Sequence, residues 1–331
     1  MAQGGISDEM MAAVRKGWQG TPEELALRNA ISANDINRLS VRQGIESTYD
    51  FHFSDEVKSK GISDQQSSGR CWLFSGMNVL RARMIEEYDL GPFQFSQNYI
   101  FFYDQLEKAN LFLQGIIDTR GLPMDDRKVE WLFRHTIGDG GQFTGVSDLI
   151  TKYGLVPSTV MPETWASNHT SGMSRLLDLK LKEFGLELRE MTGPKKELPA
   201  LLEARKVEML AFVYRFLVLN LGEPPVEFEW TMYNAAGEPV STKMYTPKSF
   251  YEEYVGVDLK NSYVMLMNDP TREFYKVYEI EYDRHQYDGE NWLYINLPID
   301  EIEKIAIASI KDGTMMYFSC DVGKFLDRQN G

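Results

Sequence analysis

The sequence contains one cysteine whose position could support nucleophilic chemistry. Cys71 lies in "DQQSSGRCWLFSGMNVLR" (64–81), between a small polar loop and a run whose apolar residues recur at helical spacing. The free N–H groups and the dipole of a helix N-terminus favour a thiolate, and the polar loop should leave the sulfur accessible. A lone cysteine in a helix is more often a small buried apolar side chain, so position alone leaves both interpretations open.

The residues around Cys71 favour the nucleophile. Gln65 precedes it by six residues and could place its side-chain amide beside the sulfur. Together with the Cys71 backbone N–H, that amide could donate to a developing oxyanion. Acyl transfer by a cysteine requires a thiolate, a pair of oxyanion donors and a base. This segment offers the first two.

The same segment resembles the active-site segment of the bleomycin hydrolase family, also called aminopeptidase C, a branch of the papain-like cysteine peptidases. Ordinary papain-type enzymes carry Cys-Gly-Ser-Cys-Trp, whereas here Ser68 replaces the first Cys and Arg70 replaces the Ser, which is typical of this branch. Further segments resemble family members in the expected order: "FQFSQNYIFFYDQLEKAN" (93–110), "DGGQFTGVSDLITKYGLVPSTVMPET" (139–164), "YVGVDLKNSY" (254–263) and "FSCDVGK" (318–324). The resemblance therefore covers almost the whole chain.

The resemblance implies amide hydrolysis through a thioester at Cys71, preferably on peptides with a free N-terminus, with Gln65 as the oxyanion-hole amide. Gly140 and Gly141 match glycines whose backbone pairs with an extended substrate, where a side chain would block close approach. A plain turn before a helix is the alternative interpretation of this pair. Trp72 and Asp321 complete the implied substrate-binding residues, although an Asp at a strand end is usually just solvated. No metal or cofactor is expected.

None of the four histidines fits the role of the base. An imidazole must pair with the thiolate and protonate the leaving amine. The family's histidine follows a strand and precedes Ala-Met-like residues, with an Asn-Ser-Trp segment later, and neither pattern surrounds His52, His135, His169 or His285. We therefore expect a C-terminally incomplete peptidase that is inactive alone. A peptide-binding or assembly fragment without turnover is the alternative.

The elements that must position these residues follow an α+β pattern. Helices are predicted over 8–43 with a cap at Thr21, 71–88, 96–117 with a cap at Ser96, the part of 138–157 that ends at Gly154, 170–220 and 298–313. Strands are predicted later in the chain: a hairpin around Asn234 to Gly237, a pair joined near Asp288-Gly289 with His285 in the turn, and a buried strand at 314–323 with Cys320 as a core thiol.

The resemblance implies a papain-like fold with helical insertions and a β half that is incomplete at the C-terminus. We divide the chain into four segments by the texture of the sequence. These are an N-terminal helical and extended segment (1–60), a helical half with the nucleophile (61–165), an inserted helical and hairpin region (166–255) and the start of the β half (256–331).

Composition limits the possible partners. The 331 residues are 43% hydrophobic and carry a formal net charge of −14, which argues against nucleic acid because phosphate binding needs clustered Lys and Arg. Two cysteines cannot form a disulfide framework or a zinc site, and no segment has the length of a signal peptide core or a membrane span. We expect a cytoplasmic protein that acts on peptides. The resemblance implies a homo-oligomer, a hexamer when the chain is complete.

Overall fold

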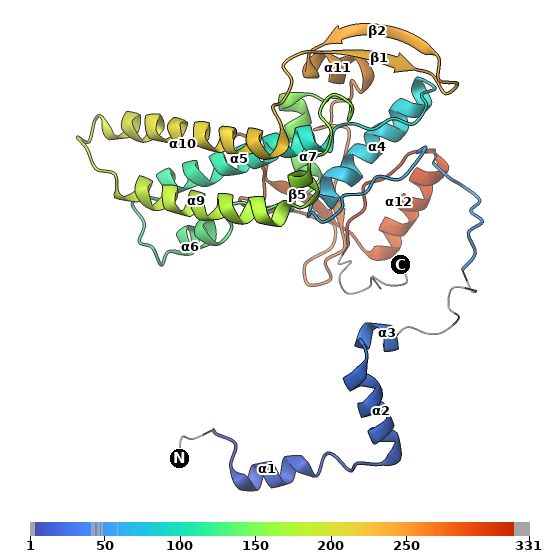
Figure 1. The fold of residues 1–331 in the computed structure, drawn as a ribbon, viewed down its shortest axis with the longest axis vertical. Coiled ribbons are helices and arrows are strands. Elements are labelled where there is room, and N and C mark those ends of the chain that lie inside the picture. Colours follow the sequence, from blue (N-terminus) through green and yellow to red (C-terminus); the bar gives the residue numbers. More distant parts are fainter. Residues whose placement is uncertain (1–3, 41–43, 45–46, 48, 58, 321–331) are drawn as a thin grey trace. The chain divides into compact units, whose positions relative to one another are not determined.

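The computed structural model describes residues 4–40, 44, 47, 49–57 and 59–320 (Figure 1). The chain divides into two compact units, one made of residues 1–54 with 320–331 and the other of residues 55–319. All predicted site residues lie in the second unit except Asp321, which is outside the described residues. The division into four segments stays a prediction.

The described helices of the first unit are α1 (Asp8–Arg15), α2 (Pro22–Ala33) and α3 (Ile36–Ser40). The cap predicted at Thr21 is confirmed, because its hydroxyl accepts from the Glu24 N–H at 3.2 Å and its own N–H donates to the Glu24 carboxylate at 3.0 Å. Neither α1 nor α2 contains a buried residue.

Helix α4 (Cys71–Glu87) confirms the helix predicted over 71–88 and is buried on most of its sides. Glycine at position 76 allows α7 (Phe143–Tyr153) to pack closely against it, since a Cβ there would lie 2.7 Å from a methyl group of Val146. Helix α7 ends as predicted at Gly154, where a φ of +78° suits glycine.

Helix α5 (Gln97–Asp118) is the centre of the helical core in this unit (Figure 1). The predicted cap is confirmed, because the Ser96 hydroxyl accepts from the Tyr99 N–H at 3.0 Å. Helix α5 packs against α4, α7 and three further helices, which are α6 (Arg127–Arg134), α9 (Thr170–Glu190) and α10 (Leu198–Leu221). The short α8 (Trp165–Asn168) directly precedes α9.

The strands of the second unit form two small sheets. The predicted hairpin is confirmed as antiparallel β1 (Phe228–Tyr233) and β2 (Pro239–Tyr245), followed by α11 (Pro247–Tyr254). In the other sheet β5 (Trp292–Asn296) is central, parallel to β3 (Leu266–Met267) and antiparallel to β4 (Lys276–Ile280). Helix α12 (Ile299–Lys311) follows β5. The expected α+β composition is therefore confirmed.

The expectation of a buried strand at 314–323 with Cys320 as a core thiol is wrong. Residues 314–320 form no strand, and Cys320 is exposed rather than a core thiol; residues 321–323 lie outside the described part. An apolar run becomes a buried strand only where a neighbouring strand accepts its hydrogen bonds, and no described strand pairs with it. The predicted strand pair joined near Asp288-Gly289 is confirmed as antiparallel β4 and β5, and His285 lies in the connection 281–291, where it is buried. No described helix is both long and apolar enough to span a bilayer.

Candidate active site

Cys71 is the first residue of α4 and its side chain is exposed, which confirms the expected position at a helix start. The preceding residue, Arg70, makes no side-chain cap. The N–H groups of the first helical turn are therefore not occupied by a capping side chain and point toward the sulfur's end of the helix. This is the arrangement that a developing negative charge needs.

Gln65 and Cys71 line the same pocket, which has a volume of about 420 Å³. The other lining residues are Ile62, Ser63, Asp64, Phe74, Ser75 and Asn78. The Gln65 Nε2 donates to the Ser68 carbonyl at 2.5 Å, and the Ser68 hydroxyl donates back to the Gln65 carbonyl at 2.7 Å. An amide NH₂ carries two hydrogens, so this bond leaves one for an acceptor in the pocket.

The loop that carries Gln65 is fixed at both ends. Gln66 has a positive φ of +52°, and Asp64 holds it by accepting from its N–H at 2.8 Å and from its side-chain amide at 2.7 Å. At the other end Arg70 is fully buried and forms a bidentate ion pair with Glu163, at 2.9 and 3.1 Å. The Gln65 amide and the Cys71 thiol are thus on rigid backbone.

Asp139 joins this loop to the glycine-rich segment 138–141, which has no regular secondary structure. Its carboxylate accepts the Gly69 N–H at 3.1 Å and the Ser174 hydroxyl at 3.0 Å, and its backbone carbonyl accepts the Trp72 indole N–H at 2.6 Å. A Cβ on Gly69 would lie 2.8 Å from the Asp139 Cβ, so this contact requires glycine.

The two glycines of the predicted substrate edge have different surroundings. A Cβ on Gly140 would meet nothing within 4 Å, so that side of the segment is open. A Cβ on Gly141 would lie 2.1 Å from the His285 ring and 2.9 Å from the Trp72 ring. Trp72 itself is 1% exposed and contacts the segment 138–141 from its buried side.

A buried histidine–carboxylate pair next to the segment 138–141 was not anticipated from the sequence. The His285 Nδ1 lies 2.5 Å from the Asp104 carboxylate, and the ring centroids of His285 and Trp72 are 4.5 Å apart. Burial lowers the pKa of His285 and the neighbouring Lys108 acts in the same direction, so the ring is neutral and donates from Nδ1. Burial alone would raise the pKa of Asp104, but Lys108 and His285 outweigh it and hold that pKa low.

The sequence offered one signal for this pair. Asp104 and Lys108 stand four residues apart in an otherwise largely apolar helix, and they form an ion pair of 2.9 Å. That spacing could have indicated a buried polar cluster, but nothing local connects it to His285.

No histidine lines the Cys71 pocket within the described ranges. His135 and His169 are exposed, and each places Nδ1 3.0 Å from a backbone carbonyl four residues earlier. His52, also exposed, belongs to the first unit and is described there alone. Among the residues that the structure describes, no group of three or more His, Cys, Asp or Glu side chains could hold a metal ion.

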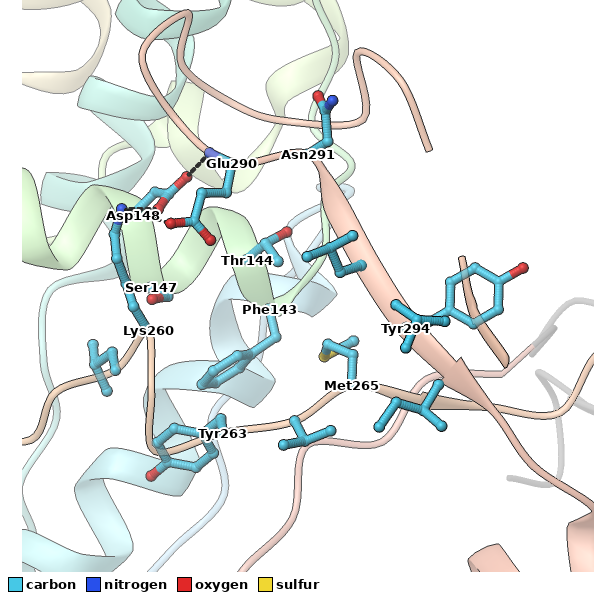
Figure 2. Close-up of a pocket in the computed structure, with 15 residues that line it drawn as sticks. Phe143, Thr144, Ser147, Asp148, Lys260, Tyr263, Met265, Glu290, Asn291 and Tyr294 are labelled. Atoms are coloured by element: carbon cyan, nitrogen blue, oxygen red, sulfur yellow. Dashed lines mark hydrogen bonds and ion pairs between the residues drawn. The ribbon is translucent and has the colours of Figure 1, made fainter. Parts of the chain in front are cut away.

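A second cavity of about 180 Å³ lies between α7 and β5 (Figure 2). Asp148, Lys260 and Glu290 gather at one end of it, where Asp148 forms an ion pair with Lys260 at 3.1 Å. Phe143 belongs to the apolar side and packs on Tyr317, with 5.8 Å between ring centroids. Burial and, to a smaller extent, the charge of Cys71 raise the pKa of Tyr317 to about 12.

Known proteins resemble this chain over nearly its whole length. The model of the Peptidase C1-like family matches residues 5–331. Aminopeptidase C from Listeria monocytogenes serovar 1/2a is 36% identical over 98% of this chain and 73% of its own length. Bleomycin hydrolase from Homo sapiens is 31% identical over 100% of this chain and 74% of its own. The crystal structure of PepW from Lactobacillus rhamnosis HN001 matches with a TM-score of 0.84 and 32% identity, covering 94% of this chain and 70% of that one.

These similarities extend well beyond the segment around the nucleophile. They confirm the expected papain-like α+β fold and the relation to cysteine peptidases named aminopeptidase C and bleomycin hydrolase. The chain spans about three quarters of the length of these relatives. It belongs to the Peptidase C1-like family.

Proposed function

We propose that this chain carries the nucleophile of a cysteine-type aminopeptidase that hydrolyses peptide amides through a thioester at Cys71. The observation that carries the proposal is the shared pocket. An exposed thiol at the start of α4 and a side-chain amide with one N–H to spare face the same cavity. The similarity to aminopeptidase C supports the choice of peptide substrates.

The proposed chemistry begins with attack of the Cys71 thiolate on the peptide carbonyl carbon. The carbonyl oxygen becomes an oxyanion, to which Gln65 Nε2 and the Cys71 N–H donate. The C–N bond then breaks and the amine leaves with a proton, which yields a thioester; water hydrolyses this to release the acid and restore the thiol. Gly140 and Gly141 would pair with the substrate backbone, Trp72 would support them, and Asp321 would lie near the substrate.

A base is the part that this pocket lacks. The leaving amine needs a proton donor, and no imidazole lines the pocket in the described part of the chain. We therefore propose that the 331-residue chain alone does not turn over. Joined to the C-terminal segment of the Listeria aminopeptidase C, a form we call the completed chain, it should hydrolyse aminoacyl amides.

Hydrolysis of a fluorogenic aminoacyl amide tests this proposal, with Cys71→Ala as the control. We expect Cys71-dependent turnover by the completed chain and none by the 331 residues alone. Turnover by the 331 residues alone would contradict the missing base. A completed chain that binds peptides without Cys71-dependent turnover would favour the alternative, a binding or assembly fragment.

We also propose a cytoplasmic location and a homo-oligomer, a hexamer for the completed chain. Two free cysteines suit a reducing compartment, and the family resemblance supports the assembly. Light scattering of the completed chain should give a mass near six times that of one subunit. A monomeric mass would contradict the assembly without touching the chemistry.

A further inference from the structure

The His285–Asp104 pair has no part in the chemistry above, yet it touches the pieces that would hold a substrate. The His285 ring packs on Trp72, the neighbour of the nucleophile, with 4.5 Å between ring centroids. It also fills the space behind Gly141 and Gly145, where added Cβ atoms would lie 2.1 and 2.5 Å from it. The His285 ring therefore prevents the segment 138–141 from moving away from a bound peptide.

Asp104 connects this ring to Lys108, a second side chain that holds the segment 138–141. One carboxylate oxygen lies 2.5 Å from the His285 Nδ1, and the other accepts from the Lys108 ammonium at 2.9 Å. The same ammonium donates to the carbonyls of Gly138 and Gly140, at 2.8 and 2.7 Å. The Asp104 carboxylate thus orients both the His285 ring, which packs against Gly141, and the Lys108 ammonium, which binds the carbonyls of Gly138 and Gly140.

The burial of this cluster makes its geometry rigid. Asp104 is fully buried and His285 is 3% exposed, while Asp283 is the other acid close enough to influence the ring. A buried carboxylate must keep its hydrogen-bond donors, because an uncompensated buried charge is strongly destabilising. The His285 imidazole and the Lys108 ammonium therefore have fixed positions. The segment 138–141, which both groups contact, is fixed as well.

We propose that His285, held by Asp104, is a positioning residue for peptide substrates: it fixes the segment 138–141 and Trp72 at the distance from Cys71 that backbone pairing requires. The inference rests on the proposed function. Recognition of a peptide by backbone pairing needs a fixed edge, and a displacement of about 1 Å can cost about 100-fold in rate. His285 acts by holding the segment 138–141 and does not touch the reacting atoms.

Two alkylation rates of Cys71 in the 331-residue chain separate positioning from thiol reactivity. Alanyl-phenylalanyl chloromethyl ketone must bind as a peptide before it reacts, whereas iodoacetamide needs no peptide site. We expect His285→Leu to lower the ratio of the two rates about tenfold or more, within the loss that misplacement causes. His285→Asn, which keeps an N–H for Asp104, should recover part of the ratio. His135→Asn, at an exposed histidine that also faces a backbone carbonyl, should leave it unchanged.

The outcomes distinguish this inference from the function on which it rests. A wild-type chain that shows no faster reaction with the peptidyl reagent contradicts the proposed function and the inference together. A wild-type preference that His285→Leu retains within about twofold contradicts the inference alone. If His285→Leu does not fold, His285→Gln replaces it, because this change removes the ring that packs on Trp72 and keeps an N–H for Asp104; a retained preference then overturns the inference equally.

Discussion

At the scale of single residues, Gln65 is held so that only half of its amide is used. Its Nε2 donates one hydrogen to the Ser68 carbonyl, and the reciprocal bond from the Ser68 hydroxyl fixes the backbone from which the side chain extends. The second hydrogen can meet an oxyanion with no reorganisation of the loop. Preorganised donors of this kind stabilise a transition state more than they stabilise a ground-state carbonyl.

Gln65→Ala should therefore lower kcat/KM of the completed chain by about 10²- to 10³-fold, as the loss of an oxyanion donor does elsewhere. Alkylation of Cys71 by iodoacetamide involves no oxyanion and should change little. Asn78→Ala is the matched control, since this amide lines the same pocket but is bound to the Ser63 hydroxyl at 2.7 Å. Equal losses in both variants would mean that Gln65 acts only through the shape of the pocket.

The neutral state of His285 makes folding stability depend on pH. Burial and Lys108 lower the pKa of His285 from 6.5, so below about pH 6.5 the unfolded chain binds a proton that the folded chain excludes. Stability contributed by this group is present above that pH and is lost as pH falls. Between pH 7 and 5, urea unfolding should show the wild type losing more stability than His285→Asn, by at most about 2 kcal/mol. Parallel pH dependences would contradict a buried neutral ring.

At the scale of elements, a buried ion pair ties the start of α4 to the segment before α8. The Arg70 guanidinium is fully buried and bridges Glu163 while lying over the rings of Phe74 and Phe101, 5.1 and 5.2 Å from their centroids. Two segments that are 93 residues apart in the chain are thereby fixed next to Cys71. The position of the nucleophile depends on this connection as well as on its helix.

Glu163→Gln should destabilise the fold by about 3 kcal/mol, because it leaves the guanidinium buried without a counter-charge. Adding Arg70→Met to this variant should recover part of the loss, since the unpaired charge is then gone. Glu87→Gln is the control, because its pair with Arg83 is exposed and 3.7 Å long, and it should change stability by less than about 0.5 kcal/mol. Thermal and urea unfolding measure all three; a double variant less stable than Glu163→Gln would contradict the buried-charge argument.

The elements that the sequence predicted are those whose signals are local. Helix α4 and the caps at Thr21 and Ser96 follow from spacing and cap residues within a few positions, and all three are confirmed. The prediction of a strand at 314–320 was wrong because a buried strand depends on a partner strand elsewhere in the chain. The burial of His285 could not be predicted either, since its partner lies 181 residues away and its own neighbours indicate a turn.

At the scale of the whole molecule, the second unit leaves apolar side chains exposed on its last elements. Helix α12 contains no buried residue, and Ile305 and Ile307 are 45% and 50% exposed. Val277 on β4 and Leu293 on β5 are also exposed, at 66% and 45%. Exposed apolar side chains favour self-association. We therefore expect α12 to contribute little to the free energy of unfolding of the 331 residues. Its exposed isoleucines should lower their solubility.

Replacing Ile305 and Ile307 together by Lys should lower the binding of the dye ANS and reduce self-association, while the free energy of unfolding in urea stays within about 0.5 kcal/mol of wild type. Both side chains are about half exposed, so the substitution removes apolar surface from water and breaks no buried contact. Leu177→Ala is the control for a core position: that side chain is 0% exposed on α9, and its truncation should cost about 2–5 kcal/mol. A loss of about 2–5 kcal/mol in the Lys variant would show that Ile305 and Ile307 are packed in solution, which would contradict their exposure.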